Sequence, residues 1–161
     1  MSEKTLIVRK IQNGTVIDHI PAGKGLPVLR VIEAEEGSRG PVVLLMNVES
    51  ERMSCKDIVK MIDVFPGKKT IEKISLLAPN ATLNTIKDSR VVEKKRIDKL
   101  KTVTEILRCP NPKCVTNDER EHVTPIFQLM DGDSNLYICL YCDTSVDDDM
   151  MPRLLLAGSN Q

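Results

Sequence analysis

Four cysteines in the last third of the chain have the type and spacing of a metal site. They form two close pairs, Cys109 with Cys114 and Cys139 with Cys142, and 24 residues separate the pairs. Two short loops that each contribute two thiolates satisfy the tetrahedral geometry that Zn²⁺ prefers. We therefore predict one zinc ion per chain on these four cysteines. Iron in a rubredoxin-like site is the alternative metal.

The ligand set predicts a structural metal and no catalytic one. Four thiolates complete the coordination shell and leave no position for water or substrate. A zinc deaminase would need a His-x-Glu sequence and a Pro-Cys-x-x-Cys sequence, whereas Ile138 precedes Cys139 and Thr124 stands two residues after His122. We expect instead that the metal helps to fold a domain of roughly fifty residues, which is small for a core without a metal or disulfide bonds.

The composition is that of a folded protein with an aliphatic core. Of the 161 residues, 41% are hydrophobic but only 2% are aromatic, so the core must be built from Val, Ile, Leu and Met. The sequence has no run of eighteen apolar residues and no apolar segment near Met1 of the secretory type, so we expect a cytoplasmic protein without a membrane partner. Thiols stay reduced there, which favours metal ligation over disulfides. For the fifth cysteine, Cys55, we expect a buried or half-buried thiol.

The charges are unevenly distributed although the net charge is zero. Residues 87–108 contain eight Lys or Arg and four Asp or Glu, whereas residues 117–149 contain nine acidic residues and one Arg. An acidic surface repels phosphate backbones, and the scarcity of aromatic side chains leaves no platform for base stacking. We therefore expect no nucleic-acid partner.

Residues before about 100 show the pattern of short strands and two helices. Strands are predicted at 6–11, 15–20, 42–48, 81–86 and 90–94, and helices at 26–33 and 70–77. The continuous apolar run at 42–48 predicts a strand buried on both faces, and residues 56–64 fit either period. If 56–64 is a strand, the order from residue 15 is βαββαβ, which predicts an α+β fold with a ferredoxin-like sheet and two helices.

Residues 94–101 have the composition of a linker, and we place a domain boundary near residue 100. The prediction is one domain over 1–100 and a small, mostly-β zinc domain over 101–161. The second part shows few helical signals, and its strand-like runs are at 124–130 and 135–140.

A second stretch with chemically active side chains lies near the start of the chain. The turn pair Asn13-Gly14 leads into a strand that ends with Asp18 and His19. Neighbouring side chains of a regular strand point to opposite faces, so Asp18 and His19 are not expected to form a catalytic pair.

Residues 14–22, GTVIDHIPA, closely resemble the signature segment of aspartate carbamoyltransferase regulatory chains. The resemblance continues through 56–60, 78–86 and 91–94, and from 108–111 to the four cysteines, in order and at similar spacings. It covers nearly the whole chain. Residues 37–52 match only in pattern, and residues after 147 are not covered.

The resemblance implies the function of a regulatory, non-catalytic subunit in pyrimidine biosynthesis. In that family the N-terminal domain binds nucleoside triphosphates, which implies CTP and ATP as allosteric effectors, with UTP as a further candidate. The zinc domain of the family docks on a catalytic chain, and regulatory chains pair through their N-terminal domains. A catalytic chain and a second copy of this chain are therefore the expected partners.

The family's nucleotide site is carried over residue by residue. Asp18 and Lys60 would meet the ribose region, His19 and Lys94 would meet the phosphates, and Lys56 would add positive charge. Two segments, 8–11 and 84–91, would border the base and sugar. From these segments we assign five residues to the nucleotide site: Val8, Ile11, Asn84, Ile86 and Val91. The family often carries an aromatic residue at the position where this chain has Ser89.

Elementary chemistry agrees with this assignment. Three lysines and an ionisable histidine can offset the charge of a triphosphate, and the absence of a Walker-type glycine loop favours binding without hydrolysis. Two other functions remain open on the sequence. A zinc-ribbon protein that binds nucleic acid would show steeply salt-dependent binding to DNA or RNA, and a small metalloenzyme would need an open coordination position.

Overall fold

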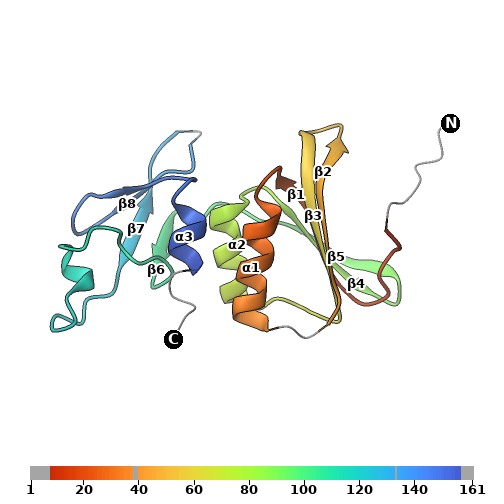
Figure 1. Ribbon diagram of the computed structural model, residues 1–161, viewed down its shortest axis with the longest axis horizontal. Helices are drawn as coiled ribbons and strands as arrows, with labels where there is room; N and C mark the ends of the chain where they lie inside the picture. Colours follow the sequence, from red (N-terminus) through yellow and green to blue (C-terminus); the bar gives the residue numbers. More distant parts are fainter. Residues whose placement is uncertain (1–7, 38–39, 133, 157–161) are drawn as a thin grey trace.

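Alternating apolar residues in the first part of the chain form a five-stranded antiparallel sheet. The computed structural model describes residues 8–37, 40–132 and 134–156. The strands are β1 (Gly14–Pro21), β2 (Val42–Ser50), β3 (Ser54–Ile62), β4 (Thr82–Lys87) and β5 (Arg90–Arg96), in the order β2-β3-β1-β4-β5. Helices α1 (Gly25–Glu36) and α2 (Lys68–Leu77) cover one face of this sheet (Figure 1). The element order from β1 to β4 is βαββαβ, so the predicted ferredoxin-like sheet is confirmed and the ambiguous segment 56–64 contains β3.

The face of the sheet toward the helices forms the core of this part. Ile17 of β1 pairs with Val59 of β3 and with Leu83 of β4, and these three side chains are buried. They pack in one apolar cluster with Val28 of α1 and Ile74 of α2, which are also buried. Each fully buried aliphatic side chain of this kind contributes roughly 1.5–3 kcal/mol through the hydrophobic effect, so the core does not need aromatic residues.

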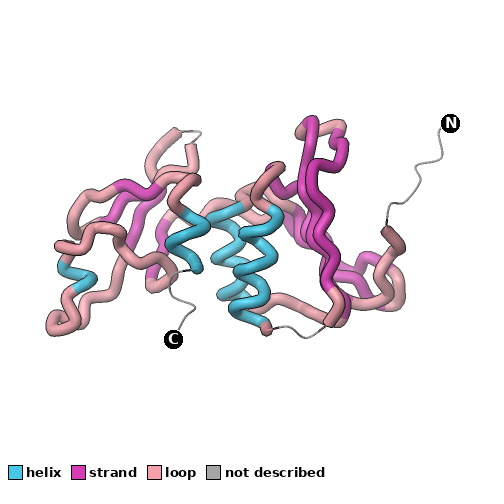
Figure 2. The backbone as a smooth tube through the Cα atoms, viewed as in Figure 1, coloured by secondary structure: helices cyan, strands magenta, loops and turns pink. Residues whose placement is uncertain are grey.

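The second part of the chain forms a smaller sheet with one short helix. Its strands are β6 (Thr102–Thr104), β7 (Ile126–Leu129), β8 (Tyr137–Cys139) and β9 (Ser145–Val146), in that order, with a 3₁₀ turn at Val115–Asn117 and helix α3 (Met151–Leu156). The predicted mostly-β character of this part is confirmed. Figure 2 shows α1, α2 and α3 between the two sheets, and α3 contacts both other helices. None of the helices in the described ranges has the length and apolarity needed to cross a membrane.

Three predictions about the first part were wrong. Residues 8–11 form no strand, and residues 6–7 lie outside the described ranges. This segment instead leads to a contact with the β4–β5 turn, where Ser89 donates a backbone hydrogen bond to Gln12 over 2.8 Å. Strand β2 is not buried on both faces, because it lies at the edge of a sheet that has helices on one face only; Met46 is 46% exposed. Cys55, at the start of β3, is exposed.

The linker and the end of the chain also differ from the expectation. Residues 94–96 belong to β5, so the extended backbone continues into the predicted linker. The pattern missed β6, β9 and α3, because elements of two to six residues are too short to show a period. Helix α3 nevertheless buries Met151 and Leu155 against the shared core.

A buried carboxylate fixes the start of α1. The Asp57 side chain, on β3, is fully buried. Its Oδ2 accepts hydrogen bonds from the backbone N–H groups of Gly23 and Gly25, each over 2.9 Å, and its Oδ1 accepts one from Asn47 N over 3.0 Å. Helix α1 has no side-chain cap and no acidic residue in its first turn, so β3 supplies the negative charge that a helix N-terminus favours.

We expect Asp57→Asn to lower the free energy of unfolding by about 2 kcal/mol or more, because the new amide places a donor against a buried N–H donor. Urea unfolding followed by circular dichroism measures this change. The matched control is Glu51→Gln, which removes an exposed carboxylate in the β2–β3 turn. Equal stability of the two variants would contradict this role of Asp57.

Candidate metal centre and ligand cavity

Two tight loops bring the four cysteines together. In the first loop, Asn117 donates from its side-chain amide to the carbonyl groups of Cys109 and Asn111, over 2.9 and 2.7 Å. The Cys114 N–H also donates to Asn111 O over 3.0 Å. The second loop is the turn between β8 and β9, in which Asp143 N donates to Cys139 O over 3.0 Å. Hydrogen bonds from backbone N–H groups and from the Asn117 side chain therefore hold the cysteine pairs in place.

The sulfur positions fit a tetrahedral metal ion. All four Sγ atoms lie within 4.8 Å of one another. The Cys109–Cys142 and Cys114–Cys139 Sγ distances are 3.5 and 3.8 Å, and a tetrahedron with metal–sulfur bonds of about 2.3 Å has edges of about 3.8 Å. Four thiolates in this arrangement suit zinc or iron.

The surroundings of the thiols favour a bound cation. Burial raises the pKa of Cys109 and of Cys139 above the usual thiol value. At Cys142 burial also opposes ionisation, but hydrogen bonds with Thr144 prevail and lower the pKa to about 6. Four clustered thiolates, three of them buried, would be costly without a counter-charge, so a metal ion is what allows them to ionise together.

A cavity of about 370 Å³ lies on the other sheet, on the face turned away from the helices. Its lining residues alternate along the strands with the core residues, as the period of two requires. Asn84, for example, lines the cavity, whereas the adjacent Leu83 packs toward the helices. The lining consists of Lys10, Ile11, Val16, Asp18, Ile58, Lys60, Asn84, Ile86, Ser89 and Val91.

The structure brings six of the predicted site residues into this lining. They are Ile11, Asp18, Lys60, Asn84, Ile86 and Val91. Val8, His19, Lys56 and Lys94 do not line the cavity. Sequence reasoning missed Val16 and Ile58, although each lies two residues before a predicted site residue of the same strand, so strand periodicity could have found them.

One row of side chains crosses the sheet through this cavity. Val16 of β1 pairs with Lys60 of β3 on one side and with Asn84 of β4 on the other, and Asn84 pairs with Lys94 of β5. Directly paired residues share a face of the sheet, so Lys94 lies on the cavity side even though it stands outside the lining. The row therefore carries an ammonium group at each end and an amide between them.

A bulge changes the relation of Asp18 to His19. The register of β1 with β3 shifts between Ile17 and Ile20, and His19 has a positive φ of 58°. The expectation that the two side chains point to opposite faces was wrong, because the bulge rotates the backbone. Asp18 Oδ1 lies 4.0 Å from His19 Nδ1 and accepts a hydrogen bond from His19 N over 2.6 Å.

This end of the cavity is rich in positive charge. Lys56 Nζ lies 2.9 Å from Asp18 Oδ1, and both side chains are mostly buried. Burial lowers the pKa of His19 below its usual value of 6.5; the Asp18 carboxylate opposes this, and the charges of Lys56, Arg52 and Lys94 lower the pKa further. One carboxylate thus faces three cations and a histidine, which is an arrangement that attracts an anion.

Comparisons with known proteins agree with this architecture. The family model described as aspartate carbamoyltransferase regulatory chain, allosteric domain, matches residues 6–98, and the metal binding domain of the same chain matches residues 101–152. The regulatory chain of Thermofilum pendens is 44% identical over 146 residues, 91% of this chain and 92% of its own length. That of Staphylothermus marinus is 47% identical over 139 residues, 85% of this chain and 84% of its own length. That of Hyperthermus butylicus is 43% identical over 155 residues, 95% of this chain and 96% of its own length.

This chain belongs to the aspartate carbamoyltransferase regulatory chain family. The resemblance found in the sequence is confirmed, and the family is one of regulatory, non-catalytic chains. The two candidate sites fall in different family domains. The cavity lies within the allosteric-domain match, and the four cysteines lie within the metal-binding match.

We expect protein purified without added metal to contain one metal ion per chain, and Cys114→Ser to contain very little, because three thiolates do not complete the shell. Elemental analysis measures this directly. Cys55→Ser is the matched control, since Cys55 is exposed and lies outside the cluster. Equal metal content in the two variants would exclude Cys114 as a ligand.

Proposed function

We propose that this chain is the regulatory subunit of an aspartate carbamoyltransferase in pyrimidine biosynthesis. Its N-terminal domain binds CTP or ATP in the cavity on the open face of the sheet, with UTP as a third candidate. Its C-terminal domain holds zinc and docks on the catalytic chain. The observation that carries the proposal is the row from Lys60 to Lys94, which crosses a cavity with an apolar end and a cationic end.

The apolar end suits a base. Ile11, Ile86 and Val91 come from three segments and meet at one end of the lining. A volume of about 370 Å³ lies in the range of small-ligand cavities, which are mainly apolar with a few polar groups that fix orientation. Asn84 and the backbone near Ser89 offer the polar groups that would distinguish one base from another.

The middle and the cationic end suit ribose and phosphates. Lys60 and Asp18 both line the cavity and can hydrogen-bond to sugar hydroxyls. Lys94, His19 and Lys56 surround the far end, where their positive charge would offset that of the phosphates. Burial and the charges of nearby cations lower the pKa of His19, and the negative charge of a bound triphosphate would shift that pKa upward.

Lys94→Ala is expected to weaken CTP binding much more than cytidine binding, because only the triphosphate presents phosphate charges to this ammonium. Isothermal calorimetry on the purified chain gives both affinities, and ATP should compete with CTP for one site. Lys101→Ala, an exposed lysine beyond β5, is the control. Equal weakening of CTP binding and cytidine binding would exclude Lys94 as a contact to the phosphates.

The metal in this proposal is zinc, held by Cys109, Cys114, Cys139 and Cys142 with a purely structural role. The sheet it organises is small, and exposed apolar side chains lie close to the cysteines. Val115, Leu140 and Tyr141 are 38%, 52% and 44% exposed. Apolar residues of this kind at a rigid site are typical of a protein interface, and we assign this surface to the catalytic chain.

Loss of the metal should therefore break assembly before it affects nucleotide binding. Cys114→Ser is expected to bind CTP nearly as wild type does, because the first sheet has its own core, yet to fail to co-elute with the catalytic chain. Size-exclusion chromatography of the mixed chains, with carbamoyltransferase activity measured against CTP, tests this. A variant that lacks metal but still assembles and transmits regulation would refute this separation of roles.

A second copy of the chain is the partner that we propose for the β2 edge. Within the described ranges, strand β2 pairs with β3 alone, and it exposes Val42 and Met46. The opposite edge, β5, carries four Lys or Arg residues and is protected by their charge. Pairing of β2 with β2 would bury the apolar edge.

Met46→Lys is accordingly expected to shift a dimer toward monomers, because it places a charge in the apolar edge. Val92→Lys, an exposed valine on β5, serves as the control and should leave the dimer intact. Sedimentation velocity at tens of micromolar distinguishes the species. A wild-type chain that sediments as a monomer would contradict the proposed dimer.

A further inference from the structure

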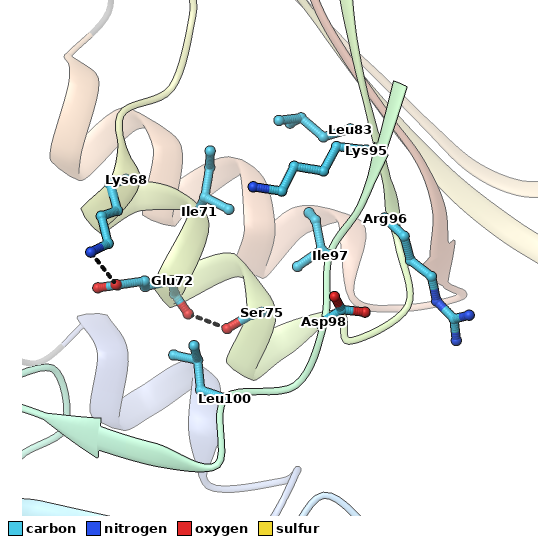
Figure 3. A pocket seen from close by; sticks show the side chains of 10 residues that line it. All are labelled: Lys68, Ile71, Glu72, Ser75, Leu83, Lys95, Arg96, Ile97, Asp98 and Leu100. Carbon is cyan, nitrogen blue, oxygen red and sulfur yellow. Dashed lines mark hydrogen bonds and ion pairs between the residues drawn. The ribbon is translucent and has the colours of Figure 1, made fainter. Parts of the chain in front are cut away.

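A second cavity, of about 420 Å³, lies on the helix side of the same sheet and contains none of the predicted site residues. It lies between α2 and the edge strand β5 (Figure 3). Figure 3 shows Ile71 of α2, Leu83 of β4 and Leu100 of the connecting segment around the same space. The exposed wall is thus mainly apolar, and its residues come from α2, β4, β5 and the connecting segment.

The lining contains three cations, Lys68, Lys95 and Arg96, and two carboxylates, Glu72 and Asp98, so positive charge is in excess. Lys95 extends across the mouth with its ammonium group directed toward α2 (Figure 3), and among the described residues it has no hydrogen-bond or ion-pair partner. Lys68 is paired with Glu72 over 3.9 Å, but its side chain is 92% exposed, so this contact is weak. An unpaired cation at the opening of an apolar space complements an anion that has an apolar body.

We propose that this cavity binds a small amphipathic organic anion, such as a carboxylate or sulfonate with an apolar body. The body fills the space beside Ile71 and Leu83, and the anionic group meets Lys95. An apolar body in this space gains dispersion contacts with the apolar side chains of the wall. A neutral ligand would leave Lys95 unpaired, and a cation would be repelled by it.

The position of the cavity gives the ligand a structural consequence. Leu100 lies in the segment that connects β5 to β6, and its carbonyl oxygen accepts a hydrogen bond from the hydroxyl of the buried Tyr137 over 2.7 Å. A ligand against Leu100 therefore holds α2, β5 and this connection together. Lys94 and Lys95 are adjacent in β5 and point to opposite faces of the sheet. The two cavities therefore lie on opposite faces. The ligand proposed here can thus be tested without a nucleotide.

The experiment uses the full chain and the fluorescent sulfonate 1-anilinonaphthalene-8-sulfonate, with no nucleotide present. We expect saturable binding at one site per chain, displaced by octanoate but not by 1-octanol at equal concentration. Lys95→Glu should weaken the dye by about tenfold, which corresponds to roughly 1.4 kcal/mol. Ile71→Trp, which fills the cavity, should abolish binding while circular dichroism remains unchanged.

Arg90→Glu is the matched control, because Arg90 is an exposed cation at the start of the same strand and does not line the cavity. It should bind the dye as wild type does. Equal weakening in Arg90→Glu and Lys95→Glu would show attraction by net charge alone and would overturn the proposal. Unchanged binding in Lys95→Glu, or displacement by 1-octanol as strong as that by octanoate, would overturn it as well. Lys95 is exposed, so its variant remains informative even if Ile71→Trp fails to fold.

Discussion

The hydrogen bonds that the buried Asp57 carboxylate accepts determine how the rest of the first sheet is arranged. They join β3 to the start of α1 and to the irregular part of β2, where Asn47 has a positive φ. A side chain at Gly25 would place Cβ 2.8 Å from Asp57 Oδ2, so only glycine permits this approach. Ile20, which pairs with Asp57, closes the bulge that contains Asp18 and His19. The geometry of the candidate ligand site therefore depends on the Asp57 carboxylate, which is buried on the other face of the same sheet.

The alternation of the strands allows one sheet to serve two purposes. Ile17, Val59 and Leu83 build the aliphatic core against the helices, and their immediate neighbours along the chain line the open cavity. Because every second residue is committed to the core, the open face can carry lysines and a carboxylate at little cost in stability. The core of this first sheet is aliphatic, whereas the fully buried aromatic residues Phe127 and Tyr137 belong to the second sheet.

The second sheet is organised in a different way. Its strands have two to four residues, and the four cysteines replace much of the apolar core that a longer chain would bury. The two parts are nevertheless packed together. The buried hydrophobic residues form one continuous cluster that includes α3, and Lys24 at the start of α1 donates to Asp148 O over 3.1 Å. A change at the start of α1 therefore reaches the second part through direct contacts, which is the property that a regulatory chain requires.

The sequence by itself determined the metal cluster, the family and five of the six elements in the βαββαβ order, because cysteine spacing, signature segments and hydrophobic period are local properties of the chain. The sixth element, in the ambiguous segment 56–64, was decided by the tertiary structure as strand β3. The sequence also named six residues of the cavity, although through resemblance and not through geometry. The tertiary structure alone decided that 8–11 is not a strand, that β2 is an edge, and that Asp18 and His19 share a bulge. Each of these depends on which segment lies alongside, and a pattern along one strand carries no record of its neighbours. For the same reason nothing in the sequence marked Asp57 as a helix cap, since its three donors come from residues 10 to 34 positions away.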